Sequence, residues 1–439
     1  MTDASMSGSM SPQLLEVAER ARREPQGQFH SLAHLIDMDA LRRAYQSQRS
    51  DAAVGIDGVT KETYGRDLEA NLQVLHDKLR SKRWRHQPIR RVHIPKDKGK
   101  TRPIGISCFE DKIVQSVLRE VLSTVYEQDF RDCSYGFRPG RSAHDALRAL
   151  NRVVMNGAAK WILEADIASY FDNIDHQMLL KMLSERVPDG SIKRLVGKCL
   201  HVGVLDGADL TTPEEGTAQG SSLSPLLGNL YLHHVLDRWF MGEIVPHLHG
   251  KAEIIRYCDD FVIGFQLQED AERVMKVLGK RLAKYGLSLQ PEKTRLIPFE
   301  RPPKTQTKGK GPGRFDFLGF VWYWRRARTG TWVLASKTRP GRLAKSIRAI
   351  SQWCRRYRHK PIPEQHAALR SRIQGHLNYF GVSGNGDSVV CFVNEVTRVW
   401  YKWLARRGQR RPLTWARYEL LLQTYPLPRP RIMQSIWFR

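Results

Sequence analysis

Two adjacent aspartates, Asp259 and Asp260, lie in the middle of an otherwise apolar, β-rich stretch. Apolar residues flank the run Tyr257-Cys258-Asp259-Asp260 on both sides. This pattern predicts a hairpin whose tight turn presents both carboxylates. Because burying two like charges side by side is costly unless a cation lies between them, the pair favours a metal ion. Asp-Asp also occurs in plain surface turns, so the pair alone does not define a site.

A second apolar segment, residues 161–166, also ends in an aspartate, Asp166, and aromatic residues follow it at 170 and 171. Two such strands lying side by side in one sheet would bring Asp166 and Asp259 together. Carboxylate oxygens suit Mg²⁺, which keeps several waters and completes its shell with phosphates. Two such ions ~3.5–4 Å apart can activate an attacking 3′-hydroxyl and stabilise a departing pyrophosphate. The three acids therefore predict nucleotidyl transfer.

The charge of the chain indicates a polyanionic partner. The 439 residues include 71 Lys and Arg against 45 Asp and Glu, a formal net charge of +26. Residues 341–439 hold 19 of the cations and 4 of the acids. Each phosphate that a protein neutralises releases a condensed counterion, so this excess favours nucleic acid. A generally solvated basic surface is the alternative, and the uneven distribution argues against it.

Cysteine spacing and hydropathy exclude several classes of protein. The six cysteines are scattered singly with no C-x-x-C pair, which argues against zinc fingers, a zinc-bound nuclease module and a disulfide framework. No apolar run approaches the ~20 residues of a membrane span. The first dozen residues do not resemble a signal peptide. We therefore expect a protein of the bacterial cytosol or nucleoid, with neither zinc nor a membrane partner.

The elements that must position the acids are mixed helices and strands. Helical periodicity covers residues 111–126, 144–155 and 270–285, and strand patterns cover residues 91–94, 160–166, 252–257, 261–265 and 315–324. Mixing without strict alternation indicates an α+β fold. We expect residues 1–30 to form a flexible lead-in with one short helix near residues 14–23. The stretch 300–314, rich in Pro, Gly and Lys, predicts a flexible basic loop.

From about residue 336 the pattern becomes helical throughout. Apolar stripes at helical spacing cover residues 343–357, 369–380 and 393–404, and glycines at 381, 384 and 386 separate the last two. Basic side chains occupy the opposite face of the first helix. So many cations with so few anions would repel one another without a polyanion, although an ordinary solvated face is the alternative. We expect nucleic-acid contacts from Arg342, Lys345, Arg348, Arg355 and Arg356.

Taken in order, these segments resemble the motifs of group II intron reverse transcriptases, also called intron maturases, from about residue 31 to the end. The motifs are GIDGVT (55–60), RVHIPK (91–96) with TRPIGI (101–106), SYGFRPGRS (134–142), GTAQG (216–220) with SPLLGN (224–229), GL (286–287) with PEKT (291–294), FLGF (317–320), LTW (413–415) and PLPRPRI (426–432). The resemblance implies a right-hand polymerase, with fingers and palm over residues 31–335. A helical thumb or maturase domain over 336–410 and a basic, DNA-binding-like segment over 411–439 would follow.

The resemblance also implies a role for each position. The catalytic acids would be Asp166, Asp259 and Asp260, and the metal ligands Asp166, Asp259 and the backbone carbonyl of Ile167. The nucleotide would be bound by Lys96, Arg102, Phe171, Gln219 and Lys293, with the Phe171 ring excluding a 2′-hydroxyl. The primer grip would be formed by Phe317, Leu318 and Gly319. The alternatives are ordinary surface cations for Lys96 and Arg102, Tyr170 as the gate, and a bulged core strand at 317–319.

The function implied is an RNA-directed DNA polymerase that extends a DNA or RNA primer on an RNA template with two Mg²⁺ ions. It would also bind group II intron RNA and assist splicing and mobility. A domesticated relative acting in host DNA repair or defence is the main alternative, and a splicing factor without catalysis or a viral RNA polymerase fits less well. The chain departs from the family at Cys258, where Ala is usual, at 168–169 and at 221–222. Nothing follows residue 439, so we expect no zinc-bound endonuclease.

Overall fold

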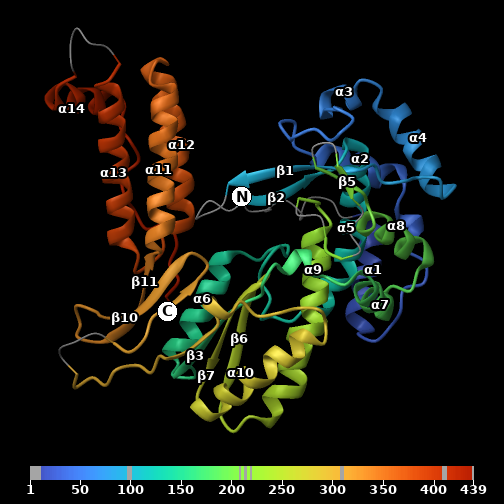
Figure 1. Ribbon diagram of the computed structural model, residues 1–439, viewed down its shortest axis with the longest axis horizontal. Coiled ribbons are helices and arrows are strands. Elements are labelled where there is room, and N and C mark those ends of the chain that lie inside the picture. Colours follow the sequence, from blue (N-terminus) through green and yellow to red (C-terminus); the bar gives the residue numbers. More distant parts are fainter. Residues whose placement is uncertain are drawn as a thin grey trace.

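The computed structural model describes residues 11–95, 101–206, 209–211, 215–217, 220–306, 311–407 and 413–437. Helices and strands are mixed in the first three quarters of the chain and helices dominate the last, so the mixed α and β character predicted from the sequence is confirmed. In Figure 1 the helical C-terminal part stands beside a lobe of N-terminal helices, and a β-sheet lies below and between them.

The central sheet has four antiparallel strands in the order β6-β7-β3-β8. Its strands are β3 (Trp161–Asp166), β6 (Ala252–Tyr257), β7 (Asp260–Phe265) and β8 (Arg295–Pro298). Successive side chains point to opposite faces, and here both faces are buried. Residues such as Ile263 pack in one core with α10 (Gln268–Ala283), while residues such as Val262 pack in another with α6 (Ala143–Met155). Burial on both faces explains why these strands read as nearly continuous apolar runs.

The N-terminal lobe combines a second sheet with helices. The sheet order is β2-β1-β4-β5, with β1 (Ile89–Pro95), β2 (Thr101–Ile106), β4 (Val204–Asp206) and β5 (Asp209–Thr211). The helices are α1 (Pro12–Arg23), α2 (Met38–Ser47), α3 (Lys61–Gly65), α4 (Leu68–Arg80), α5 (Phe109–Asp129), α7 (His176–Arg186) and α8 (Gly190–Leu200). The long helix α5 is the centre of this lobe, because most of its residues are buried.

Helix α1 lies where a short helix was expected within residues 1–30, and it packs against the N-terminal lobe. Leu14 and Ala21 on one face of α1 are buried in the core that α5 shares. The guanidinium of Arg186 donates to the carbonyl oxygens of Ala21 and Glu24 (3.2 and 2.9 Å) and pairs with Asp129. An amphipathic face and a buried ion pair therefore hold this segment against the lobe.

The sequence between residues 315 and 324 forms a hairpin, so the prediction of one continuous strand was wrong. Strands β9 (Phe315–Phe317) and β10 (Phe320–Arg326) pair antiparallel, and β11 (Trp332–Thr338) completes a three-stranded sheet. Leu318 and Gly319 form the turn, with φ of 51° and 81°. The chain reverses there because both residues adopt left-handed backbone angles, which a strand cannot contain.

The C-terminal helices are α11 (Pro340–Tyr357), α12 (Ile362–Phe380), α13 (Gly386–Leu404) and α14 (Trp415–Thr424). They share a core of their own in which Ile350, Leu369, Val396 and Trp400 are buried. The chain then returns to the body of the molecule, where Gln434 bridges Val382 and Ile436 enters the core beside α6. Over the described part of the chain, no helix is both long and apolar enough to cross a membrane.

Candidate active site

The central sheet brings the three predicted acids together. Asp166 is the last residue of β3 and lies directly opposite Asp260, the first residue of β7. Tyr257 pairs with Asp260, which leaves Cys258 and Asp259 as the two residues of the β6–β7 turn. Cys258 has a φ of 60°, the left-handed value that tight hairpin turns require. The three carboxylates therefore meet at one end of the sheet because two strands end and a hairpin turns at the same level.

Burial and mutual repulsion set the charge state of these acids. Burial raises the pKa of Asp259, and the negative charge of Asp166 adds to the rise. The positive charge of Arg102, at the start of β2, acts in the opposite direction on Asp259. Burial raises the pKa of Asp260 to about 7, although the Leu318 amide lowers it. Partly desolvated carboxylates that repel one another are stabilised by a bound cation.

Asp260 links the carboxylate end of the sheet to the β9–β10 turn. Its side chain accepts a hydrogen bond from the backbone amide of Leu318 at 3.3 Å. The carbonyl oxygen of Leu318 in turn accepts from the hydroxyl of Tyr379 in α12 at 3.0 Å. The residues predicted as a primer grip (Phe317, Leu318 and Gly319) thus lie beside the acids. The connection through Tyr379 was not anticipated from the sequence, since Tyr379 lies 61 residues after Leu318 in the chain.

Asp166 has a basic partner in Lys293, whose ammonium group forms an ion pair with the Asp166 carboxylate. Lys293 lies in the short 3-10 helix Pro291–Lys293, and the amide of Gln290 donates to the Asp166 carbonyl oxygen at 2.8 Å. Ile167 is buried and forms a β-bridge with Leu289. The structure therefore places the Lys293 ammonium group beside the Asp166 carboxylate.

The side chains available as metal ligands determine which kind of metal site this end of the sheet could provide. Within the residues that the structure describes, no three His, Cys, Asp or Glu side chains are arranged to hold an ion by themselves. The side chain of Asp260 is directed at the Leu318 amide, so Asp166 and Asp259 are the two carboxylates of the three that remain available to an ion. Mg²⁺ is usually held by one or two carboxylates plus waters and substrate phosphates. The residues present therefore fit an ion that is completed by a bound nucleotide.

The structure describes three of the five residues predicted to bind the nucleotide, which are Arg102, Phe171 and Lys293. Lys96 and Gln219 lie outside the described residues, and Arg102 is exposed at the edge of the site. Phe171 is half-buried and its carbonyl oxygen accepts from the Thr217 amide at 2.7 Å. Tyr170 is buried in the core, where its hydroxyl donates to the Gly228 carbonyl oxygen at 2.5 Å. Of the two candidate gate rings, Phe171 is therefore the one that is accessible.

The five basic residues predicted to bind nucleic acid are all exposed on α11 (Arg342, Lys345, Arg348, Arg355 and Arg356). Two of them also lie over aromatic rings, with the guanidinium of Arg355 5.9 Å from the Trp403 centroid and that of Arg356 5.4 Å from the Tyr357 centroid. Trp400, by contrast, is fully buried and donates to Gln365 at 3.1 Å. Helix α11 thus presents these cations outward, whereas Trp400 of α13 lies in the core of the helical part.

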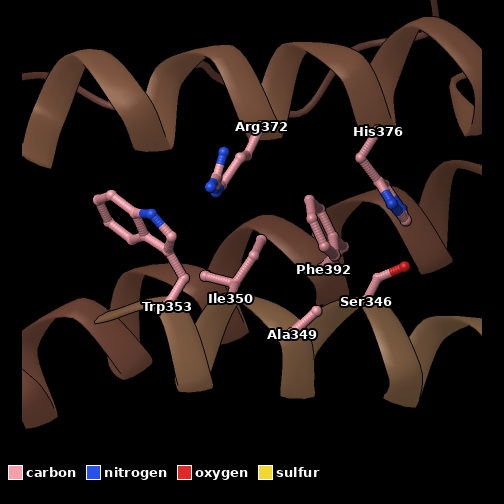
Figure 2. A pocket seen from close by; sticks show the side chains of 7 residues that line it. All are labelled: Ser346, Ala349, Ile350, Trp353, Arg372, His376 and Phe392. Carbon is pink, nitrogen blue, oxygen red and sulfur yellow. The ribbon is translucent and has the colours of Figure 1, made fainter. Parts of the chain in front are cut away.

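A cavity of about 490 Å³ lies between α11, α12 and α13, away from the three acids. Figure 2 shows Trp353 below Arg372, whose guanidinium lies 4.8 Å from the indole centroid. At the other end the His376 ring stacks on Phe392 with centroids 3.5 Å apart. Burial lowers the pKa of His376 to about 4, so the ring is neutral at pH 7. No pattern in the sequence indicated this cavity, because its lining residues come from three separate helices.

A buried arginine beside the acids was also missed from the sequence. Arg256, at the penultimate position of β6, has no exposed surface and forms an ion pair with Asp237 at 2.5 Å. A signal was present, because a charged residue inside the apolar run of β6 must either face solvent or have a buried partner.

Comparison with known proteins places the chain in a family. Residues 94–322 match the family model described as "Reverse transcriptase (RNA-dependent DNA polymerase)". Protein YkfC of Escherichia coli (strain K12) is 32% identical over 293 residues, which are 59% of this chain and 77% of YkfC. The group II intron-encoded protein LtrA of Lactococcus lactis subsp. cremoris is 33% identical over 266 residues, 60% of this chain and 43% of LtrA. An uncharacterized 91 kDa protein in the cob intron of Schizosaccharomyces pombe is 36% identical over 223 residues, 51% of this chain and 27% of that protein.

The carboxylate end of the sheet and its surroundings lie within the matched region. The chain belongs to the reverse transcriptase family of RNA-dependent DNA polymerases, and within it to the members that resemble group II intron proteins. It spans most of YkfC but less than half of LtrA.

Proposed function

We propose that the protein is an RNA-directed DNA polymerase that extends a DNA or RNA primer with deoxynucleotides on an RNA template, with two Mg²⁺ ions. The observation that best supports this proposal is the register of β3 and β7, which sets Asp166 opposite Asp260 and next to the Asp259 turn. Three acids gathered at a sheet end, two of them with raised pKa values, are a costly arrangement without a cation.

The parts of a right-hand polymerase can be assigned on this basis. The central sheet with α6 and α10 would be the palm, and the β1–β2 hairpin with the N-terminal helices would be the fingers. The bundle of α11, α12 and α13 would be the thumb or maturase domain, from about residue 336 to 410. Residues 411–439 would be the basic segment, and here α14 packs its Tyr418 into the bundle core.

Different residues at this end of the sheet would bind the metal ions and the nucleotide. Asp166, Asp259 and the Ile167 carbonyl would hold the ions, and bound Mg²⁺ would supply Lewis acidity to the 3′-hydroxyl and the departing pyrophosphate. Arg102 and Lys293, together with Lys96, would meet the triphosphate. Gln219 would line the nucleotide pocket.

Asp260 and Phe171 would have two further roles beside the ions. Asp260 would keep the hairpin and the predicted primer grip in register through its bond with the Leu318 amide. Phe171 would lie under the sugar and exclude a 2′-hydroxyl, because Tyr170 is held in the core. The exposed cations of α11 would follow the backbone of the template–primer duplex.

A second role, binding group II intron RNA to assist splicing and mobility, is supported by the similarity to the intron-encoded protein LtrA. The alternative is a group II-like reverse transcriptase that serves host DNA repair or defence. The two differ in the flanking DNA, because ribozyme sequence around the gene supports the intron role and its absence excludes it.

The polymerase proposal is tested by primer extension on an RNA template with Mg²⁺, with deoxynucleotides and ribonucleotides supplied in separate reactions. We expect extension with deoxynucleotides only, and none after chelation of the metal. Asp259→Ala and Asp166→Asn should abolish synthesis while RNA binding, measured by fluorescence anisotropy, survives.

A matched control is Glu253→Gln, which removes an exposed carboxylate from the same hairpin. It should leave synthesis unchanged. Full synthesis by Asp259→Ala would contradict the site, and equal use of ribonucleotides would contradict the reverse-transcriptase assignment of the pocket.

A further inference from the structure

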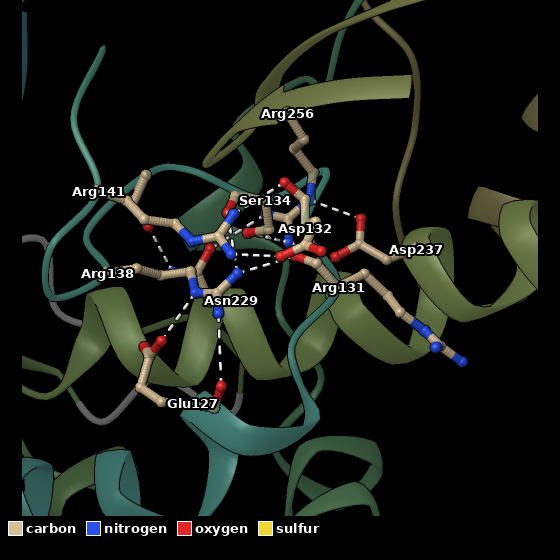
Figure 3. Close-up of polar contacts among 10 residues, drawn as sticks. Glu127, Arg131, Asp132, Ser134, Arg138, Arg141, Asn229, Asp237 and Arg256 are labelled. Atoms are coloured by element: carbon tan, nitrogen blue, oxygen red, sulfur yellow. Dashed lines mark hydrogen bonds and ion pairs between the residues drawn. The ribbon is translucent and has the colours of Figure 1, made fainter. Parts of the chain in front are cut away.

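A buried guanidinium lies directly behind the turn that carries Asp259. All five N–H groups of Arg256 have acceptors, as Figure 3 shows in part. Nε and Nη2 donate to the two carboxylate oxygens of Asp237 at 2.8 and 2.5 Å. Nη2 also donates to the Ser134 hydroxyl at 2.8 Å. Nη1 donates to the side-chain oxygen of Asn229 and to the backbone carbonyl of Cys258, both at 3.1 Å.

The bond to the Cys258 carbonyl is the one that reaches the acids. That carbonyl belongs to the peptide that joins Cys258 to Asp259, so its direction sets the direction in which Asp259 leaves the turn. Cys258 has a left-handed φ of 60°, which is unfavourable for a residue with a side chain unless the surroundings impose it. Arg256 supplies such a constraint from inside the protein, because its buried guanidinium holds the Cys258 carbonyl.

The arginine is itself held rigidly from two directions. Residues 133–135 run alongside the end of β6, where the Tyr135 amide donates to the Arg256 carbonyl oxygen and the Arg256 amide to the Cys133 carbonyl oxygen, both at 2.8 Å. The Ser134 carbonyl oxygen accepts from Arg138, which forms an ion pair with Glu127 in α5 (Figure 3). The turn is therefore tied through Arg256 to the N-terminal lobe.

Asp237 reaches the arginine from a distorted helix. It is the last residue of the π-helical turn His233–Asp237, which continues α9 (Ser224–Leu232). An inserted π-turn shifts the helix face by one residue and is often found near functional sites. Although burial opposes the charge, Asp237 holds the pKa of Arg256 above its ordinary value, so the pair is ionised. A fully bonded fork of this kind fixes position far better than a point charge such as Lys.

We propose that Arg256, anchored by Asp237, Asn229 and Ser134, is a positioning residue of the polymerase reaction that fixes the Cys258–Asp259 peptide and thereby the Asp259 carboxylate. This inference rests on the proposed polymerase function and assigns no contact between Arg256 and substrate. A displacement of about 1 Å at a reacting group can cost about 100-fold in rate. Loss of the fork should therefore slow the chemical step and leave nucleotide and RNA binding intact.

The test is single-turnover incorporation of one nucleotide by Arg256→Lys, with the fraction of active molecules measured by titration with primer–template. We expect the incorporation rate per active molecule to fall by about 100-fold, with unchanged apparent nucleotide affinity and RNA affinity. Ser134→Ala removes one acceptor but keeps the ion pair, so it serves as the second variant if Arg256→Lys does not fold. It should show a smaller loss of the same kind.

The matched control is Arg186→Lys, which weakens another buried ion pair, that with Asp129, where the N-terminal lobe packs against the end of α1. It should lower the melting temperature and leave the rate per active molecule unchanged. A wild-type rate per active molecule in Arg256→Lys or, if that variant does not fold, in Ser134→Ala would overturn the inference, as would an equal slowing by Arg186→Lys. If the wild-type protein incorporates no nucleotide at all, the proposed function fails instead.

Discussion

Gly136 packs against the back of the catalytic hairpin so closely that no side chain fits there. A Cβ atom at this position would lie 2.6 Å from the amide nitrogen of Cys258 and 3.0 Å from the carbonyl carbon of Tyr257. Ordinary contacts to a Cβ begin at 3.4 Å, and both neighbours are backbone atoms that cannot rotate away. The substitution Gly136→Ala must therefore displace either the turn or residues 134–136.

The required displacement gives the size of the effect. Restoring a 3.4 Å contact moves the turn by about 0.8 Å, which is close to the ~1 Å that costs about 100-fold in a catalytic rate. That factor corresponds to about 2.7 kcal/mol of transition-state stabilisation. Overpacking also lowers the free energy of unfolding, by roughly 1–3 kcal/mol. Rates must therefore be expressed per active molecule.

The assay is single-turnover incorporation of one deoxynucleotide, with unfolding by urea measured in parallel. Gly197→Ala in α8 is the matched control, since a Cβ there meets open space. It should gain roughly 0.5–1 kcal/mol of stability, because Gly is unfavourable inside a helix, and keep its rate. A rate per active molecule for Gly136→Ala that equals the wild-type rate would refute the claim that the turn tolerates no displacement.

Four other predictions concern separate parts of the molecule. Phe171→Ala should lower discrimination against ribonucleotides by about 10–100-fold, measured as a ratio of kcat/KM values, because the accessible ring is removed. Cys258→Ala should preserve polymerisation but shift fidelity or the preference between Mg²⁺ and Mn²⁺, because the buried side chain directly precedes Asp259 in the turn. Arg348→Ala and Arg355→Ala should each reduce the slope of log affinity against log salt by about 0.7–0.9 in RNA-binding titrations. Burial raises the pKa of Asp111 to about 7, so Asp111→Asn should gain stability relative to wild type as pH rises from 4 to 7.

The sign of the pH prediction follows from proton counts. The unfolded carboxyl at position 111 ionises near pH 3.8, whereas the folded one keeps its proton to about pH 7. The contribution of Asp111 to the free energy of unfolding is therefore complete at low pH. It declines by up to about 4 kcal/mol as the pH rises from about 4 to about 7. Urea unfolding at pH 5 and pH 8 measures the difference between the proteins, and an equal difference at both pH values would contradict it.

The other three predictions have equally plain opposite outcomes. If Phe171→Ala discriminates against ribonucleotides as strongly as the wild type does, the Phe171 ring is not the group that excludes the 2′-hydroxyl. Identical fidelity and metal response in Cys258→Ala would leave the cysteine without influence on the site. An unchanged salt slope in the α11 variants would show that these cations do not contact phosphates.

The positions of the three acids could be predicted because they depend on local sequence patterns of strands and turns. Each of Asp166 and Asp260 lies at the end of an apolar run that reads as a buried strand, and the Asp259 turn lies between two such runs. The C-terminal helices were equally clear from their periodic apolar stripes. What the sequence could not show is the partner of a buried charge. Arg256 meets Asp237 at the end of a π-turn, and the apolar periodicity of the sequence does not reveal that turn.

The split of residues 315–324 was missed for a related reason. Leu318 continues the apolar pattern of the strand before it, so nothing in that residue type marks the left-handed turn that it makes with Gly319. Tertiary contacts impose the turn, since the Leu318 amide donates to Asp260 and its carbonyl accepts from Tyr379. A pattern of side-chain types reports which residues are buried. It does not report where long-range hydrogen bonds bend the chain.

These missed contacts explain how the acids can be held close together before any cation binds. Three contacts hold the hairpin turn. Arg256 donates to the Cys258 carbonyl oxygen, Gly136 packs against the backbone of the turn, and Asp260 accepts from the Leu318 amide. The free energy of folding thus bears the cost of assembling like charges, and the carboxylates need no rearrangement when a cation and a nucleotide arrive. Preorganised charges are worth more in a partly dry site than the same charges in water. It follows that variants of the three supporting contacts should slow nucleotide addition more than they weaken nucleotide binding, whereas variants of Asp166 and Asp259 should abolish addition outright.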